Sequence, residues 1–245
     1  MAWWQAGCPV RPVEQEWIES SMDWLADTFD PLRIGGEVLL PTDEYFPGTY
    51  TGSRADVRAV FLRLCAHMDV DPARVDLVHD DAFTDDALSA HVPVRSAWSG
   101  AAGHHRVVGG RSVIGINDEQ AKSPMALVAT IAHELGHVLL LGEGRISADR
   151  KDHEPLTDLL TVYFGLGVFS ANAAFAFGRE VRGEYAYTTT SRLGYLTVPM
   201  FGYGLAYYAW LRGEADPGWA RFLDTNPRTY CRRGLRYLRA RGPSS

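Results

Sequence analysis

SPMALVATIAHELGHVLLLG, residues 123–142, is the segment from which the architecture of this chain follows. Ser123 followed by Pro124 is typical of a helix start, because proline is favoured in the first helical turn. The apolar residues continue to Leu141, and the glycine at 142 is typical of a helix end. The segment therefore predicts a helix that is apolar around most of its circumference and buried in the core.

The same helix carries His133, Glu134 and His137 in the pattern H-E-x-x-H. Residues four apart lie on one face of a helix, so both imidazoles can bind one metal ion. Glu134 lies on the flank of that face, where its carboxylate can contact a water molecule on the metal. Three ionisable side chains are costly in an apolar helix unless they are paired or bind a metal. The pattern predicts a metal site, and a cluster held by hydrogen bonds alone is the alternative.

A second polar cluster, DHEPLTD at residues 152–158, opens the next expected helix. Its Glu154 and Asp158 are four apart and therefore share a face. Together with H-E-x-x-H, this arrangement resembles the gluzincin metallopeptidases, in which E-x-x-x-D follows the first motif on a later helix. The resemblance covers His133 to Asp158 and the strand before them, and it identifies no subfamily.

The resemblance implies a catalytic zinc ion with His133, His137 and Glu154 as its ligands. Asp158 would then accept a hydrogen bond from the far nitrogen of His133 and fix the tautomer of that ring. His153, beside Glu154, is a rival third ligand.

Two further parts of such a site can be sought in the sequence. The resemblance implies that Ser112–Asn117 is an edge strand that pairs with the substrate backbone, unless it is an ordinary interior strand. Hydrolysis builds negative charge on the attacked oxygen, so an electrophilic helper is expected opposite Glu134. We select Tyr203 for this role from a wider set of candidates. That set is Tyr195, Tyr203, Tyr207, His104 and His105.

Outside these motifs the pattern is mainly helical. Apolar spacing predicts helices over residues 13–29 and from the cap residue Ser53 to Met68. From Pro155 the pattern is helical again as far as Leu238. The expected interruptions are at Gly183, Pro199, Gly213–Pro217 and Asn226–Pro227.

Strand signals are fewer. Val75–Val78 reads as a short strand, and Gly109-Gly110 between the runs 104–108 and 111–117 predicts a hairpin. We therefore expect an α+β, zincin-like fold, mainly helical, with a small antiparallel sheet before the metal-binding helix. Residues 1–100 would form an N-terminal region and residues 101–245 the metal-binding domain, unless the two are one continuous domain.

Composition bounds the remaining properties. The 245 residues carry a formal net charge of −6, which argues against nucleic acid as the main partner. The charge is unevenly distributed, because the residues from Arg221 onward include seven arginines and one aspartate. Three scattered cysteines predict no disulfide framework. No secretory signal is visible, so we expect a cytoplasmic protein. The uncharged stretches 159–178 and 193–211 are diluted by polar residues and glycine, which favours buried helices over membrane spans.

These observations predict a zinc metallopeptidase that acts on a peptide or protein substrate. Zinc would carry and activate a water molecule, Glu134 would act as general base, and the oligomeric state stays open. A non-catalytic metal-binding or interaction protein that retains a zincin scaffold is the alternative.

Overall fold

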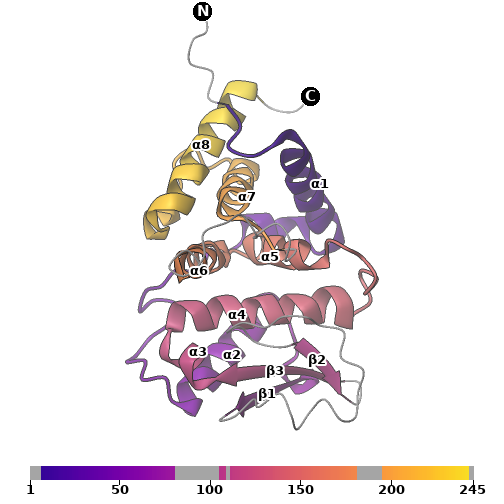
Figure 1. Cartoon of the computed structure of the whole chain (residues 1–245), viewed down its shortest axis with the longest axis vertical. Coiled ribbons are helices and arrows are strands. Elements are labelled where there is room, and N and C mark those ends of the chain that lie inside the picture. Colours follow the sequence, from indigo (N-terminus) through magenta and orange to yellow (C-terminus); the bar gives the residue numbers. More distant parts are fainter. Residues whose placement is uncertain (1–6, 81–104, 109–110, 181–194, 243–245) are drawn as a thin grey trace, which may run out of the picture.

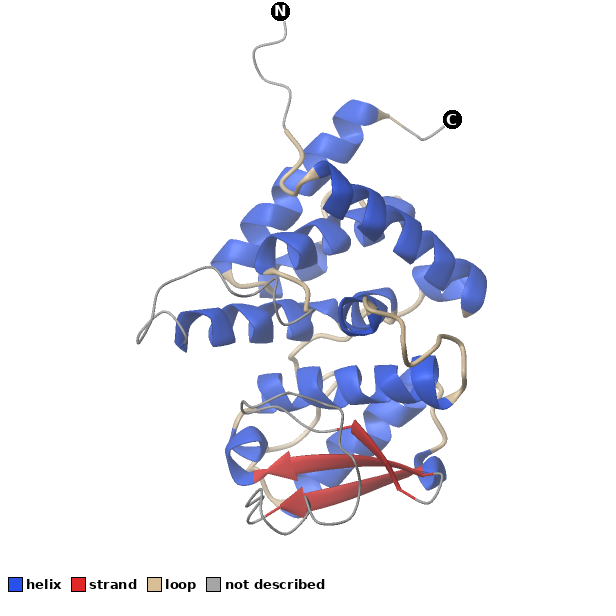
Figure 2. Cartoon of the chain, turned by 45° about the vertical axis from the view of Figure 1, so that its right-hand side comes forward, coloured by secondary structure: helices blue, strands red, loops and turns tan. Residues whose placement is uncertain are grey.

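A computed structural model describes residues 7–80, 105–108, 111–180 and 195–242 of the chain. The fold is α+β and mainly helical, as predicted. In Figures 1 and 2 the small sheet lies at one end of the molecule and α4 (Pro124–His137) lies above it. Helix α2 (Arg54–Met68) lies on the sheet side of α4, and the other long helices are stacked beyond α4. The metal-motif helix therefore lies between the sheet and the helical layers.

The sheet is mixed rather than wholly antiparallel, which corrects the sequence prediction. Its strands are β1 (Val75–Asp80), β2 (His105–Val108) and β3 (Arg111–Asn117), in the spatial order β1-β3-β2. The β2–β3 pair is antiparallel, as expected for two strands joined by a short connection. The β1–β3 pair is parallel, which is possible because a long stretch of chain separates these two strands.

The position of β3 also overturns its predicted role. Every residue of Ser112–Asn117 is paired with a residue of β1, and β2 pairs with Arg111–Ile114 on the other side. Over Arg111–Ile114, β3 lies between two strands and is interior, which contradicts the substrate-binding edge that the resemblance implied for Ser112–Asn117. Among the described residues, Gly115–Asn117 pair with β1 alone. Its Ile114 and Ile116 are fully buried and anchor the sheet in the core.

Two predicted helices pack around this part of the core. Ser53 accepts a hydrogen bond from the backbone of Asp56 and caps α2 (Arg54–Met68), as its sequence predicted, and α2 packs against α4. The sequence also predicted one continuous helix to Leu141. The segment is indeed helical as far as Gly142, but the α-helix α4 ends at His137 and Val138–Gly142 continues it as a wider π-helical turn. Such turns are frequent next to functional sites.

A sharp break that the sequence analysis missed separates α5 (His153–Tyr163) from α6 (Gly167–Glu180). Gly165 adopts a φ of +75°, a conformation that favours glycine. A Cβ atom there would overlap the backbone oxygen of Glu37, and the amide of Leu39 donates to the Gly165 carbonyl at 3.0 Å. The break therefore serves a close contact with a distant segment, which local sequence patterns do not reveal.

The last layer consists of α1 (Pro12–Thr28), α7 (Val198–Leu211) and α8 (Thr225–Arg241). The helix predicted over residues 13–29 is confirmed as α1. Pro199 and Pro227, which were predicted to interrupt helices, lie instead in the first turns of α7 and α8, where proline is tolerated. The interruption predicted at Gly183 lies outside the described residues.

Both predicted regions contribute to one hydrophobic core. In the N-terminal region, α1 packs against α5 and α7, and β1 pairs with β3. Buried residues from both regions form a single cluster, including Ile18, Phe61, Leu135 and Leu205. The boundary proposed at residue 100 itself lies outside the described residues.

Close packing of α7 on α8 depends on two glycines, and this yields a stability prediction. A Cβ atom at Gly234 would lie 2.6 Å from Cβ of Ala206, and one at Gly202 would lie 3.0 Å from the Cys231 amide nitrogen. We expect Gly202→Ala and Gly234→Ala each to lower the free energy of unfolding by about 1–3 kcal/mol, because the helices must move apart. Urea denaturation measures this.

Gly218→Ala is the matched control, because a Cβ atom at Gly218 would have no neighbour within 4 Å. If the substitutions at 202 and 234 cost no more than this control, the two helices are not closely packed in solution.

In the part of the chain that the structure describes, Pro124–Gly142 is the one helical segment long and apolar enough to cross a membrane by length and composition alone. Of its apolar window, 67% is buried inside the protein, as in the core helix of a soluble protein. This segment is neither of the two uncharged stretches that the sequence analysis considered as possible membrane spans, residues 159–178 and 193–211.

Candidate metal centre

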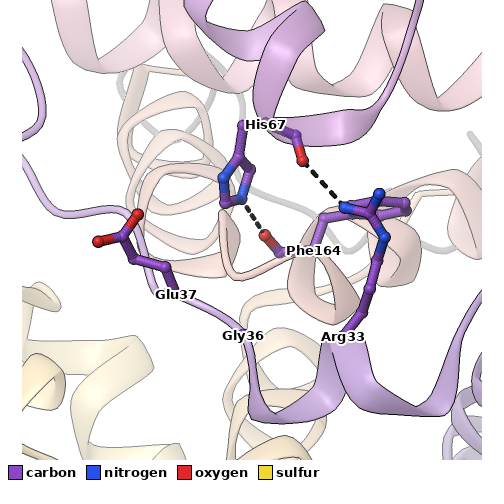
Figure 3. Close-up of a pocket in the computed structure, with 5 residues that line it drawn as sticks. All are labelled: Arg33, Gly36, Glu37, His67 and Phe164. Atoms are coloured by element: carbon purple, nitrogen blue, oxygen red, sulfur yellow. Dashed lines mark hydrogen bonds between the residues drawn. The ribbon is translucent and has the colours of Figure 1, made fainter.

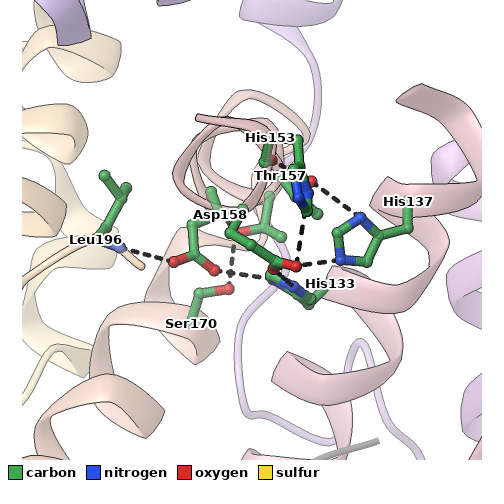
Figure 4. Close-up of polar contacts among 9 residues, drawn as sticks. His133, His137, His153, Thr157, Asp158, Ser170 and Leu196 are labelled. Carbon is green, nitrogen blue, oxygen red and sulfur yellow. Dashed lines mark hydrogen bonds and ion pairs between the residues drawn. The ribbon is translucent and has the colours of Figure 1, made fainter. Parts of the chain in front are cut away.

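Two imidazoles from α4 and one carboxylate from α5 meet in the protein. One donor atom from each of His133, His137 and Glu154 lies within 4.8 Å of the other two. Nε2 of His133 is 3.1 Å and Nε2 of His137 is 3.4 Å from Oε2 of Glu154. Figure 4 shows the two histidine rings extending from α4 toward α5. These three groups can hold a metal ion, and they are the ligands that the resemblance implied.

Asp158 hydrogen-bonds to the ring of His133 through the nitrogen that does not face Glu154. Nδ1 of His133 donates to Oδ1 of Asp158 at 2.9 Å, which is the contact that the resemblance implied. The other oxygen of Asp158 accepts from the backbone amide of Leu196 at 3.0 Å. Asp158 therefore keeps a proton on Nδ1, and Nε2 is the nitrogen that faces Glu154. In the metal-free protein Nε2 donates to the Glu154 carboxylate, and a bound metal ion would take the place of that proton.

Thr157 orients the second ring, that of His137, in a similar way. The sequence analysis did not identify this residue. Its hydroxyl donates to the carbonyl of His153 at 2.8 Å and lies 3.3 Å from Nδ1 of His137. A hydroxyl that donates to a carbonyl offers its lone pairs to an N–H, so Nδ1 of His137 carries the proton and Nε2 faces Glu154. Gly136 permits this approach, since a Cβ atom there would lie 2.8 Å from Cγ2 of Thr157.

This contact predicts an effect on metal affinity. We expect Thr157→Val, which keeps the shape of the side chain but removes the hydroxyl, to weaken metal binding about tenfold, because His137 loses the partner that orients it. Competition with a chromophoric chelator measures the affinity. Thr157→Ser keeps the hydroxyl and should bind as the wild type does; equal affinities for all three proteins would contradict the assigned role.

Glu134 lies close enough to His133 and Glu154 for their charges to shift its pKa. The side chain is buried, and its Oε2 has no hydrogen-bond partner among the residues that the structure describes. A buried carboxylate oxygen without a hydrogen-bond partner costs folding free energy. We therefore expect a proton, a water molecule or a ligand to occupy the position next to this oxygen. The donor set around it, two imidazoles and a carboxylate, fits a metal ion that carries water.

The pKa values describe the metal-free cluster. Burial lowers the pKa of His133, but its hydrogen bonds to Asp158 and Glu154 outweigh burial and raise it to about 10. Burial raises the pKa of Glu134 to about 8. Burial also opposes ionisation of Glu154, yet hydrogen bonds from His133 and His137 hold its pKa well below the usual range. Burial lowers the pKa of His137. The metal-free cluster therefore binds protons that a divalent cation can replace.

These pKa values predict how the stability of the metal-free protein depends on pH. The pKa of His133 rises from 6.5 to about 10 on folding, and that of Glu134 from 4.5 to about 8. A group whose pKa is raised by folding stabilises the fold below its unfolded value and loses this effect as pH rises through the folded value. We therefore expect the Tm of the metal-free protein to fall by several degrees between pH 6.5 and pH 10.

Adding zinc should flatten this dependence, because the ion takes the place of the protons. Differential scanning fluorimetry with chelator and with zinc measures both curves. A Tm of the metal-free protein that is constant over this range would contradict the protonated cluster.

A support from the N-terminal region fixes the entry to α5. Asp152 accepts from the indole of Trp17 at 2.8 Å and from the guanidinium of Arg150 at 2.7 Å. The hydrogen bond from Arg150 lowers the pKa of Asp152 to about 2. Because Asp152 stands two residues before Glu154, these contacts hold the start of the helix that presents the third donor.

The structure does not bring Tyr203 to the cluster. Its ring is buried between α7 and α8, and its hydroxyl donates to Glu19 on α1. Tyr207 likewise donates to Asp23 on α1. The choice of Tyr203 as electrophilic helper therefore fails on geometry. His104 and the side chain of His105 lie outside the described residues.

Tyr195 is the tyrosine that lies at the site. Its ring centroid is 5.6 Å from that of His133, and its hydroxyl hydrogen-bonds with Glu154. Burial and the nearby carboxylate of Glu154 raise its pKa well above the usual range, so the hydroxyl keeps its proton. Leu196, the next residue, is the one held by Asp158, so the same aspartate positions a ligand histidine and this tyrosine.

A separate pocket lies away from these residues. It is lined by Arg33, Gly36, Glu37, His67 and Phe164 (Figure 3). Nε2 of His67 bonds the Phe164 carbonyl at 2.6 Å, and Arg33 donates to the His67 carbonyl. These hydrogen bonds link residues on both sides of the break between α5 and α6. We therefore interpret the pocket as part of a structural contact.

Comparison with models of known protein families, with curated proteins and with solved structures gives no match.

Proposed function

We propose that this protein is a zinc-dependent metallopeptidase of the gluzincin type. The observation that carries the proposal is the carboxylate of Glu134, which is buried and has an oxygen without a hydrogen-bond partner among the described residues. It stands beside three groups that can hold a metal ion. A carboxylate in this position suits a general base for hydrolysis, whereas a redox metal site has no need of one.

The ligand set favours zinc. Two imidazoles and a carboxylate with a remaining open position describe a catalytic zinc site. A zinc ion held by His133, His137 and Glu154 would act as a Lewis acid and would lower the pKa of a bound water to about 7. Zinc also has no redox chemistry of its own, which suits simple hydrolysis.

The chain's own residues supply the other functions. Glu134 takes the proton from the attacking water and later delivers it to the leaving amine. Tyr195 donates its hydroxyl hydrogen to the oxygen on which negative charge develops, the role first given to Tyr203. Asp158 and Thr157 hold His133 and His137 as Nδ1–H tautomers, so both rings keep Nε2 available for the ion.

The proposal is tested with a mixture of peptides from a denatured protein. The zinc-loaded chain should generate new peptide termini, detected by mass spectrometry, and a chelator should stop this. The alternative, a non-catalytic metal-binding protein with the same scaffold, predicts one bound ion per chain and no new termini. Stoichiometric zinc without cleavage over long incubation would favour that alternative.

A further inference from the structure

The outer face of α8 carries a stripe of arginines. The helix contains six arginines and no acidic residue. Arg228, Arg232, Arg236 and Arg239 follow one another at intervals of four, four and three residues, so they share one face. Arg232, Arg236 and Arg239 are exposed, as is Arg233 beside them, and Arg228 is half-buried. At 1.5 Å per residue the stripe extends over about 16 Å, with one guanidinium about every 6 Å.

Among the described residues, these charges have no counter-ion. Arg241, at the end of the helix, pairs with Glu19 of α1 at 2.8 Å. No residue in the described parts of the chain forms an ion pair with the arginines of the stripe. Like charges three and four residues apart on a helix repel one another and reduce its stability. Neutralisation by an external anion would relieve this repulsion.

The opposite face of α8 is buried against α7. Cys231, Leu235 and Leu238 are buried, and Gly234 packs closely on Ala206 of α7. An amphipathic helix adsorbs to a membrane by inserting its apolar face. Since this face is packed on α7, the charged groups that α8 exposes are its guanidinium groups.

We propose that this arginine stripe binds the phosphate backbone of a nucleic acid without regard to sequence. Guanidinium groups bind phosphate in a bidentate manner, and a linear row of them fits a polymer of regularly spaced phosphates. Exposed ion pairs with the carboxylates of another protein contribute little, whereas contacts with nucleic acid release condensed counterions and gain affinity from each phosphate.

The net charge of −6 suggested the opposite from sequence, but that value describes the whole chain and not this face. At physiological salt, charges are screened over about 8 Å, so acidic residues elsewhere on the surface repel a bound polyanion only weakly. In Figures 1 and 2, α8 also lies at the end of the molecule opposite the sheet. A duplex bound along α8 would therefore lie at the opposite end of the molecule from the sheet.

Fluorescence anisotropy of a labelled 20-base-pair DNA duplex tests the proposal with the full chain. The slope of log K against log salt is about −0.9 per phosphate contact, so four contacts predict about −3.6 and about a fifty-fold loss of affinity between 50 and 150 mM salt. Changing Arg232, Arg236 and Arg239 to Gln together should reduce the slope by about three and weaken binding strongly.

A matched control changes Arg54, Arg58 and Arg63 on α2 to Gln, which removes the same charge from another exposed surface. This control should bind as the wild type does. The proposal is overturned by any of three results: no binding at 50 mM salt, equal loss in both triple variants, or binding to phosphatidylserine vesicles in preference to DNA. The measurement does not involve the metal, so its outcome is independent of the peptidase proposal.

Discussion

Glu134→Gln should retain one metal ion per chain and lose almost all hydrolytic activity. Glutamine has nearly the same shape as glutamate but cannot accept the proton of the attacking water. Removing a positioned general base typically costs about 10²–10⁴ in rate, and we expect kcat/KM to fall by about a thousandfold. Metal content by elemental analysis and cleavage by mass spectrometry are measured on the same preparation.

The control for this substitution is Glu119→Gln. Glu119 is exposed, and among the described residues its ion-pair partner is the nearby Lys122, at 2.6 Å. This variant should cleave at the wild-type rate. Wild-type turnover by Glu134→Gln would refute the role assigned to the carboxylate, and loss of the metal in that variant would show that Glu134 is itself a ligand.

Glu154→Ala should abolish stoichiometric metal binding, whereas His153→Ala should not. Oε2 of Glu154 lies within 3.4 Å of both ligand imidazoles, and its removal leaves two nitrogens to hold the ion. We expect the affinity to fall by at least about a hundredfold, more than for the loss of an outer hydrogen bond. Equilibrium competition with a chromophoric chelator gives both affinities.

His153 is the discriminating comparison because it is the other donor that the sequence offered. Its Nδ1 is 3.5 Å from Oε1 of Glu154, and its ring centroid is 5.9 Å from that of His137. Circular dichroism checks that both variants are folded. Should only His153→Ala lose the ion, the third ligand is His153, and Glu154 orients the histidines instead.

The three residues that the structure brings together could be selected from sequence because their geometry is local. His133 and His137 share a face by helical periodicity alone, and Glu154 follows only 21 residues after His133. Thr157 carried a usable signal that was not used. It is three residues after Glu154 on the same helix and therefore shares its face.

The remaining parts depend on contacts between distant segments. Tyr195 reaches the site because Leu196 is bound by Asp158, 38 residues earlier, and no spacing rule encodes that contact. The amphipathic pattern could not separate Tyr195 from Tyr203, since both are aromatic residues in apolar surroundings. Likewise the local pattern of β3 predicted a strand, but only the parallel partner β1 showed that the strand is interior.

The hydrogen bond between Trp17 and Asp152 joins residues 135 positions apart. All the proposed metal ligands lie in the second half of the chain, so a truncated protein starting near residue 105 would carry each of their donor atoms. It would nevertheless lack the indole that steadies the loop before Glu154, as well as the helix that α5 and α7 pack against. A shortened protein designed to keep this centre must therefore include α1 as well as the segments that carry His133, His137 and Glu154.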